Sequence, residues 1–171
     1  MSISVKEQLH GLVIRRLWIE LSNQLPEAHF HLDTGNSQSS YTVNAIMPSI
    51  LGRGKRLKAG LFIKHSTKRV TPWDFTFRQS DQDEIQSLRE TCGEVFTIFV
   101  NGLDGVACLS YDQLKLVLDD NHEEQEWVTF TRKRNQSYRF KGNDGSEEHV
   151  LARNSFPQGV VDYLAEVVGE K

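Results

Sequence analysis

Apolar residues near the start of the chain recur with the period of an α-helix. They fall at every fourth position from residue 9 to residue 21, along one side of a helix predicted over residues 5–23. Ser4 and Glu7 have the spacing of a capping box at the start of this helix, and Pro26 follows its expected end. We therefore expect an amphipathic helix that packs through a stripe formed by Leu9, Val13, Leu17 and Leu21.

The next part of the chain is rich in apolar runs that predict β-strands. The first and the fourth of these runs alternate apolar and polar residues, whereas the third is apolar enough to lie at the centre of a sheet. Clusters of glycine, proline and serine separate the runs, as turns do. The four predicted strands are residues 29–33, 41–47, 57–66 and 71–77.

Further elements are predicted after residue 78. Residues 80–91 have a helical pattern with Ser80 and Asp83 as the capping pair, and residues 93–100 form a continuous apolar run typical of a strand buried on both faces. Residues 106–110 return as a short strand after a glycine-containing turn. The remaining predicted elements are a helix over 111–120 capped by Ser110 and Gln113, a hairpin of strands 127–133 and 137–142, and a last helix capped by Ser155 and Gln158.

This order of elements indicates a mixed α+β (α/β) domain. Strands occur in runs between few helices, so we expect a single central mixed sheet flanked by helices. A chain of 171 residues is most simply one domain, residues 1–171. Within it, residues 5–118 form the expected core, and residues 119–171 add the C-terminal β-hairpin and the last helix.

Charge is distributed unevenly along the chain. The whole sequence has 20 basic and 23 acidic residues, yet residues 34–73 contain no aspartate or glutamate. Such a concentration of positive charge favours a polyanionic partner more strongly than the net charge of −3 does. The cations of this acid-free segment are Arg53, Lys55, Arg56, Lys58, Lys64, Lys68 and Arg69.

The acid-free segment has three interpretations. Lysine and arginine side chains that neutralise backbone phosphates release counterions, so the segment fits a nucleic-acid contact. Glycines at positions 52 and 54 would allow a close approach to a phosphate backbone, without reading bases. The same charges also fit an acidic protein surface, or a solvated loop with no specific role.

A second basic cluster lies in the predicted C-terminal hairpin, where cations are interleaved with aromatic residues. Strand alternation places Tyr138 and Phe140 on the face opposite the cations, and we expect this aromatic face to be core rather than a base-stacking platform. The nucleic-acid interpretation gains support if the two basic clusters share one face of the molecule. The second cluster consists of Arg132, Lys133, Arg134, Arg139 and Lys141.

Several function classes lack their signatures. Cys92 and Cys108 are not in a C-x-x-C arrangement and are expected to be buried, reduced thiols. The sequence has no P-loop, no G-x-G-x-x-G and no G-x-S-x-G, and it predicts no metal site and no cofactor. It also has no apolar run near the roughly 20 residues of a membrane span and no signal-peptide layout. We therefore expect a cytoplasmic protein without membrane contact.

Two passages in the middle of the chain have an informative order of elements: GLFIKHSTKRVTPWDFTF and EVFTIFVNGLDGVACLSYDQLKLVL. With the helix and strands before them they follow the order α-β-β-β-α-β over residues 5–118. In this order the chain resembles the PD-(D/E)XK, or restriction-endonuclease-like, superfamily. The resemblance matches Lys64 to the motif lysine of that family, whose carboxylates hold a divalent metal ion against the scissile phosphate. It implies a prokaryotic protein that acts on or near nucleic acid.

The acids that carry catalysis in this family are missing at the matched positions. The resemblance places an acid or a glutamine at residue 62 and another acid near residues 39–44, where this chain has Phe62 and the sequence SSYTVN. The nearest carboxylates that could replace them are Glu20, Asp33 and Asp74. With such relocated acids the chain would be a divergent Mg²⁺-dependent nuclease that uses Lys64.

The sequence thus favours a restriction-endonuclease-like module that has lost its metal carboxylates. Such a module would bind nucleic acid, or a nucleic-acid-processing complex, through its basic surface. A protein-interaction subunit without nucleic-acid contact is the alternative, and the divergent nuclease is the second alternative. The expected contact residues are the seven cations of the acid-free segment together with Arg132, Lys133 and Arg134.

Overall fold

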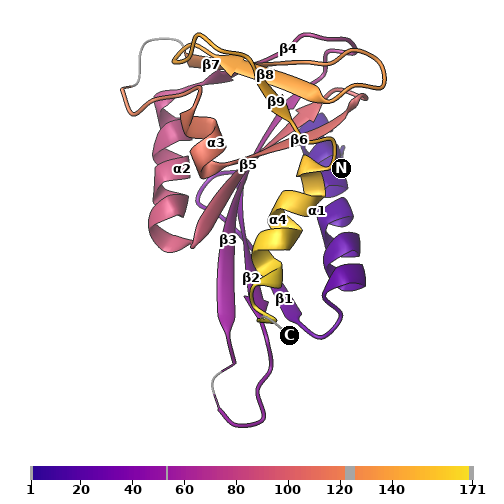
Figure 1. Ribbon diagram of the computed structural model, residues 1–171, viewed down its shortest axis with the longest axis vertical. Coiled ribbons are helices and arrows are strands. Elements are labelled where there is room, and N and C mark those ends of the chain that lie inside the picture. Colours follow the sequence, from indigo (N-terminus) through magenta and orange to yellow (C-terminus); the bar gives the residue numbers. More distant parts are fainter. Residues whose placement is uncertain (1, 53, 122–125, 170–171) are drawn as a thin grey trace.

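The structure, a computed structural model, describes residues 2–52, 54–121 and 126–169 and has three layers (Figure 1). A five-stranded sheet, sheet A, forms the middle layer with the strand order β1-β2-β3-β5-β6. β3 and β5 are parallel, and the other neighbours are antiparallel. The strands of sheet A are β1 His29–Thr34, β2 Ser40–Ile46, β3 Arg56–Ser66, β5 Glu94–Asn101 and β6 Gly105–Ser110.

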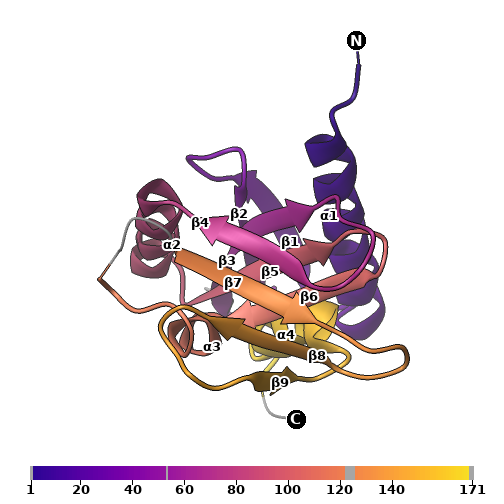
Figure 2. The ribbon, with the colours of Figure 1, turned by 90° about the horizontal axis from the view of Figure 1, so that it is seen from above.

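A four-stranded antiparallel sheet, sheet B, lies across one face of sheet A (Figure 2). Helices α2, Gln79–Thr91, and α3, Tyr111–Lys115, cover the same face beside sheet B. The opposite face is covered by α1, Val5–Gln24, and α4, Ser155–Ala165. The strands of sheet B, in their spatial order, are β4 Trp73–Phe77, β7 Glu126–Thr131, β8 Tyr138–Gly142 and β9 His149–Leu151.

Two buried cores hold the three layers together. One lies between sheet A and the pair α1 and α4, and the other lies between sheet A and the group of sheet B, α2 and α3. β5 contributes to both cores, because every residue from Val95 to Asn101 is buried. This confirms the prediction that the continuous apolar run is a strand covered on both faces.

Helix α1 confirms the predicted amphipathic pattern. The Ser4 Oγ accepts a hydrogen bond from the Glu7 N–H at 3.1 Å, and the Glu7 carboxylate accepts one from the Ser4 N–H at 2.7 Å, which completes the capping box. Val13, Leu17 and Leu21 are fully buried against sheet A. No helix in the described part of the chain combines the length and the apolar character of a membrane span.

The expected α+β class is confirmed, but the described part of the chain forms two sheets where the sequence indicated a single central one. The strand predicted over residues 71–77 does not extend sheet A. β4 pairs instead with β7, and its Trp73, Phe75 and Phe77 side chains point into the core beneath sheet B. The apolar face of β4 is therefore buried by packing sheet on sheet rather than by adding an edge strand.

Residues 119–171 are interleaved with the rest of the chain rather than added to it. Strands β7, β8 and β9 need β4 to complete sheet B. Helix α4 packs beside α1 on sheet A through Val160, Val161 and Leu164. Residues 5–118, taken as the core in the sequence-based prediction, therefore contain only part of each buried core.

Helix α2 begins one residue before the predicted start, with a different cap. Ser80 and Asp83 do not cap it. Arg78 is the N-cap residue of α2, and its N–H donates a hydrogen bond to the Asp81 Oδ2 at 3.0 Å. A carboxylate at this place also interacts favourably with the positive end of the helix dipole.

Two predictions for the C-terminal half were also wrong in detail, and one short strand was not predicted. Helix α3 ends at Lys115 rather than near residue 120, because Val117 turns into the second core. Ser155 does not form a capping box, since its Oγ accepts a hydrogen bond from the Cys108 N–H at 3.3 Å. The short strand β9 lies after the turn at residues 143–148. Its three residues are too few to show an alternation of apolar and polar positions, so the sequence does not predict it.

His10 is expected to make the protein less stable in acid. Its ring is only 4% exposed, with the Nδ1 at 3.0 Å from the Tyr41 hydroxyl. Burial, with smaller contributions from Lys6 and His65, lowers its pKa to about 4. The unfolded chain binds this proton near pH 6.5, about the ordinary value for histidine. The contribution of His10 to the free energy of unfolding should therefore be constant above about pH 6.5 and should fall as the pH drops toward 4.

Thermal unfolding at a series of pH values between about 8 and 4.5 checks this expectation. The variant His10→Gln can still hydrogen-bond to Tyr41 but cannot titrate, so its melting temperature should decline less in acid. The remaining decline comes partly from His65, whose pKa is also lowered by burial and by Lys6 and Lys64. Identical acid profiles for the two proteins would contradict the assignment to His10.

Candidate nucleic-acid interface

Three chain connections meet at one end of the molecule, the upper right in Figure 1. The Arg132 N–H donates a hydrogen bond to the Thr71 Oγ1 at 3.3 Å. The Arg132 guanidinium lies 2.8 Å from the Asp104 carboxylate, which also accepts a hydrogen bond from the Tyr138 hydroxyl at 2.6 Å. These contacts join the β3–β4, β5–β6 and β7–β8 connections, residues 67–72, 102–104 and 132–137, which we call the three-loop end.

The three-loop end is closely packed around a glycine. Gly102 has a φ of +55°, and a Cβ atom there would lie 2.1 Å from the Lys68 carbonyl oxygen. The same oxygen accepts a hydrogen bond from the Trp73 Nε1 at 2.9 Å, and the Gly102 N–H donates to the Ser66 carbonyl at 3.0 Å. The β3–β4 connection is thus held against the β5–β6 turn by backbone contacts that only a glycine permits.

The Asp104 carboxylate orders the polar side chains of this end. Burial and Asp104 raise the pKa of Tyr138 to about 12, so its phenol stays protonated and donates to the carboxylate. The Arg132 guanidinium lies over the Tyr138 ring, 4.5 Å from its centroid. Arg132 is therefore fixed by an ion pair and a cation–π contact, and it positions the loop that follows it.

The exposed cations of the three-loop end come from both basic clusters. Lys68 is only loosely paired, with its Nζ 4.0 Å from the Asp74 carboxylate. Arg69, Lys133 and Arg134 are exposed, and no described residue forms an ion pair with them. A cationic side chain without an ion pair inside the protein is available to bind an external anion. The cations here are Lys68, Arg69, Arg132, Lys133 and Arg134.

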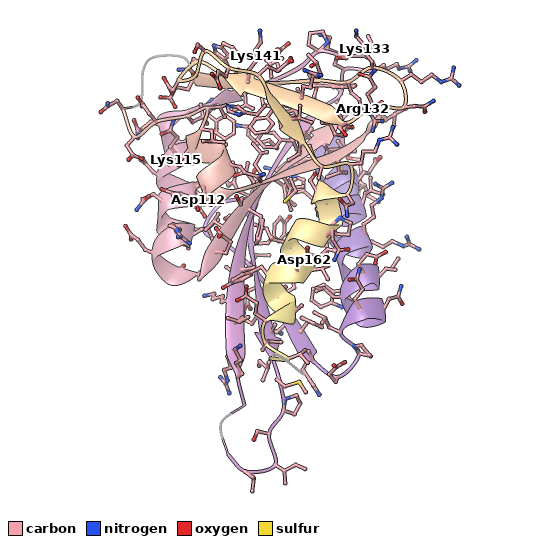
Figure 3. The ribbon with its side chains drawn as sticks, viewed as in Figure 1. Asp112, Lys115, Arg132, Lys133, Lys141 and Asp162 are labelled. Atoms are coloured by element: carbon pink, nitrogen blue, oxygen red, sulfur yellow. The ribbon has the colours of Figure 1, made fainter. Side chains whose placement is uncertain are left out.

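Positive charge continues onto the outer face of sheet B. Arg139 and Lys141 point outward from β8, whereas Tyr138 and Phe140 are each 2% exposed and belong to the second core. The prediction that the aromatic face is core is therefore confirmed. Figure 3 shows Lys133 and Lys141 at the top of the molecule over sheet B, with Arg132 just below Lys133. Arg139 is paired with the Glu148 carboxylate at 3.0 Å.

Three other cations of the acid-free segment lie at or near the opposite end of β3. Arg56 is its first residue and Ser66 its last, and eleven residues of strand span about 33 Å. Lys55, Arg56 and Lys58 are therefore far from the three-loop end, and the Lys55 ammonium donates a hydrogen bond to the Glu166 carbonyl. Arg53 lies outside the described residues. The acid-free segment thus forms two separate basic surfaces.

Lys64 lies in a partly buried site between β3, β4 and α2. Its Nζ is 2.7 Å from the Asp81 Oδ2, donates to the Thr76 carbonyl at 2.6 Å and lies 4.6 Å from the centre of the Phe77 ring. Phe62, at the position where the resemblance expects an acid, is 2% exposed and part of the second core. The lysine is present, but its carboxylate partner comes from the helix.

A second carboxylate from α2 lies one helical turn further on. The Ser40 hydroxyl donates to the Glu84 Oε1 at 2.5 Å, and Ser40 is the register partner of Phe62. Residues at positions i and i+3 share one face of a helix, so Asp81 and Glu84 lie on the same side of α2, where Asp81 contacts Lys64 on β3 and Glu84 contacts Ser40 on β2. Neither residue is among the site residues predicted from the sequence. Their signal is the D-x-x-E spacing at residues 81–84, directly after β4.

The three acids named from the sequence lie elsewhere. Asp33 accepts hydrogen bonds from His31 and from the Asn44 amide on the exposed face of β1 and β2. Glu20 accepts one from Gln24 on α1, across sheet A from Lys64. Asp74 accepts one from the Thr129 hydroxyl on the outer face of sheet B. None of these side chains joins Lys64 among the described contacts.

One carboxylate cluster in the described part of the chain has ligand atoms within 4.8 Å of one another, and it consists of Asp119, Glu126 and Asp144. Oxygen ligands at such separations can hold a divalent cation. Backbone N–H groups already hold two of the carboxylates in place, Asp144 through Asp119 at 3.0 Å and Asp119 through Asn121 at 2.6 Å. These contacts order Asp119 and Asp144, and we assign the cluster no function.

The ion pair between Asp81 and Lys64 is expected to stabilise the folded protein. Both side chains are largely covered, at 18% exposed for Lys64 and 23% for Asp81. The variant Asp81→Ala removes the α2 cap and leaves the lysine without its partner, so it should lower the free energy of unfolding by about 2 kcal/mol. Urea unfolding measures the loss. Asp83→Ala, at an exposed position on the same helix, is the matched control and should change stability by less than about 0.5 kcal/mol. Equal effects of the two variants would contradict this role of Asp81.

No protein family model, no curated protein and no solved structure matches this chain. The geometry of the three-loop end and of the Lys64 site therefore carries the functional interpretation on its own.

Proposed function

We propose that the protein binds nucleic acid through the three-loop end, as a restriction-endonuclease-like module that does not cut its ligand. One observation carries this proposal: cations from two distant parts of the sequence converge on one end of the fold. Arg69 comes from the acid-free segment, and Lys133 and Arg134 come from the C-terminal hairpin. All three are exposed and lack ion-pair partners among the described residues.

The chemistry of this end suits the phosphate backbone rather than base edges. Its cations are on loops and not on a helix or ribbon of a size to enter the major groove. The nearby aromatic residues are buried, which removes them as a platform for base stacking. We therefore expect binding that depends little on sequence and strongly on salt.

Binding of unrelated DNA duplexes across a salt series tests the proposal. With three to five phosphate contacts the affinity should fall about 100-fold between about 50 mM and 200 mM salt. Fluorescence anisotropy with a labelled duplex measures this fall. Absence of binding at about 50 mM salt would overturn the proposal and favour an acidic protein surface as the partner.

A second candidate function, metal-dependent phosphodiester cleavage, is favoured by the carboxylates of α2 beside Lys64. A metal ion held by Asp81 and Glu84 would supply a Lewis acid at the position where the resemblance expects one. Asp81 is, however, already paired with Lys64, and Glu84 with Ser40. The primary proposal therefore expects no nicking of plasmid DNA with Mg²⁺ or Mn²⁺. Nicking that requires the metal and is lost in both Lys64→Ala and Asp81→Asn would establish the second function.

A further inference from the structure

Strand β1 is an open edge of sheet A. It is the first strand in the order β1-β2-β3-β5-β6, and none of its residues is buried. β6 forms the other edge, but its four central residues are buried, and the Cys108 N–H donates a hydrogen bond to the Ser155 Oγ at the start of α4. An edge strand whose outer side is not covered presents its backbone groups to other chains.

The outward-facing backbone groups of β1 belong to Phe30, Leu32 and Thr34. The Gly35 N–H donates a hydrogen bond to the Ser40 carbonyl at 2.7 Å, in continuation of the β1–β2 register. Consecutive residues of an antiparallel strand point their N–H and C=O groups alternately toward and away from the neighbouring strand. The odd-numbered residues of β1 therefore face β2, and the even-numbered ones face outward. Within the described part of the chain, the other hydrogen bonds on β1 are formed by side chains.

β1 also lacks the features that protect edge strands in other proteins, which include proline, lysine, a bulge or a short length. Its sequence HFHLDT has no proline and no lysine, and all of its residues are in unbroken register with β2. The edges of sheet B are blocked or short. On β4 the Thr76 carbonyl accepts a hydrogen bond from the Lys64 ammonium at 2.6 Å, and β9 has only three residues. β1 is therefore the edge that fits a further β-strand.

The side chains of β1 are complementary to a second copy of the same strand. His31 and Asp33 share the exposed face of β1, with the His31 Nε2 at 3.0 Å from the Asp33 Oδ1. Two copies of β1 that pair antiparallel about a two-fold axis at Leu32 place His31 of each copy opposite Asp33 of the other. These two residues form a pair without backbone hydrogen bonds, in which the side chains approach most closely. Opposite charges directly across two strands are stabilising, and like charges are destabilising.

The backbone groups select the same register. With the axis at Leu32, this residue forms a hydrogen-bonded pair with its own copy, and Phe30 forms one with Thr34 of the second copy. All three outward-facing residues are then used. Moving the axis by one position leaves Phe30 or Thr34 without a strand partner, and it places either His31 or Asp33 opposite its own copy. The register centred on Leu32 is therefore favoured by both hydrogen bonding and charge.

An apolar groove beside β1 is covered by the same pairing. Gly11, Trp18 and Ile19 of α1 and Leu32 of β1 are among the residues that line it. Ile19 is 40% exposed, and the Trp18 ring lies 6.3 Å from that of Phe30 on β1. A two-fold axis perpendicular to the sheet keeps both copies of α1 on one face. The two grooves then meet above the paired strands, as the same patch does in a two-fold symmetric dimer.

We propose that β1 is a dimer interface, through which two copies of this chain pair in the antiparallel register centred on Leu32. The pairing joins two five-stranded sheets into one continuous sheet. A second copy is the occupant because the order of His31 and Asp33 matches its own reverse, which a strand from an unrelated protein has no reason to do. The inference goes beyond the proposed binding of nucleic acid and does not depend on it, since none of these residues belongs to the three-loop end.

Sedimentation of the full chain over a concentration series tests the hydrogen bonds of the pairing. The variant Thr34→Pro loses an outward-facing N–H but no hydrogen bond to β2, and proline is tolerated on the outer side of an edge strand. Each copy in the dimer loses one hydrogen bond, so the dissociation constant of the dimer should rise about 30-fold. Thr34→Val keeps the N–H and is the matched control, which should dimerise as the wild type does.

Exchanging the charges tests the register. His31→Glu places a carboxylate opposite Asp33 of the second copy and should weaken the dimer about tenfold. His31→Glu/Asp33→Lys restores opposite charges across the axis, so it should recover the affinity of the wild type. This recovery is specific to the axis at Leu32, because with the axis moved by one position each new side chain at residue 31 or 33 would face its own copy.

A wild type that stays monomeric at roughly 100 µM protein overturns the proposal and leaves the edge to a strand of a different protein. A dimer that neither Thr34→Pro nor His31→Glu weakens overturns it as well, because the interface then lies elsewhere. Weakening by both variants without recovery in the charge exchange overturns the register centred on Leu32. Thermal unfolding at dilute protein concentration, where the wild type is monomeric, shows whether each variant is folded.

Discussion

The double variant Lys133→Glu/Arg134→Glu is expected to bind duplex DNA on the order of 100-fold more weakly than the wild type at about 50 mM salt. Both side chains are exposed in the β7–β8 connection and have no ion pair with the described residues, so their charge is available to phosphates. Reversal removes two contacts and adds repulsion. The loop itself should keep its shape, because Arg132 and Tyr138 still hold it to Asp104.

The matched control is Arg15→Glu/Arg16→Glu, which makes the same change of charge on the exposed side of α1. This helix covers the opposite face of sheet A from sheet B. The control should lose affinity only about two- to threefold, through the change in net charge. Anisotropy titrations measure both. Equal losses in the two variants would show that binding follows the total charge and not the three-loop end.

The variant Phe130→Ala is expected to lower the free energy of unfolding by about 4 kcal/mol. Phe130 is 0% exposed and lies at the centre of an aromatic cluster that joins the two sheets. Its ring centre is 4.7 Å from that of Phe99 in sheet A and 5.8 Å from that of Phe140 in sheet B. Removing the ring leaves a cavity in this cluster and also loses the aromatic contacts, which have their own preferred geometry.

Leu103→Ala is the control for this expectation, because Leu103 is 88% exposed in the β5–β6 turn. Its effect on stability should stay within about 0.5 kcal/mol. Chemical denaturation followed by tryptophan fluorescence reports on the same region, since Trp73 and Trp127 are both in sheet B. A loss of less than about 1 kcal/mol for Phe130→Ala would mean that sheet B is not packed on sheet A as described.

Local sequence patterns predict an element of this fold when the pattern is the same whichever other element packs against it. The four-residue spacing of Val13, Leu17 and Leu21 defines α1 whichever sheet it covers, and the unbroken apolar run of β5 requires cover on both faces. The alternation of apolar and polar residues in β4 is equally clear, but this alternation does not indicate which strand pairs with β4. Its partner β7 follows only after α2, β5, β6 and α3, so the pairing that makes the second sheet depends on tertiary structure and not on the local pattern.

The candidate interface is predictable in composition but not in arrangement. The acid-free segment supplies Lys68 and Arg69 to the three-loop end, yet the eleven residues of β3 separate them from Arg56 at the other end of this strand. Asp104, in a turn of sheet A, joins the loop of Arg132 to the β5–β6 turn. The contact between Asp81 and Lys64 could not be predicted from the sequence either, because it depends on how α2 packs on β3.

The salt dependence of duplex binding tests the central claim most directly, because its slope counts the phosphates that the protein contacts. For the wild type we expect the logarithm of the affinity to fall with the logarithm of the salt concentration with a slope of about −4. Lys133→Glu/Arg134→Glu should reduce the slope to about −2, since each lost phosphate contact lowers it by about one. Arg15→Glu/Arg16→Glu should keep the wild-type slope. Parallel lines for all three proteins, or a wild type without salt-dependent binding, would contradict the claim that the three-loop end is the nucleic-acid interface.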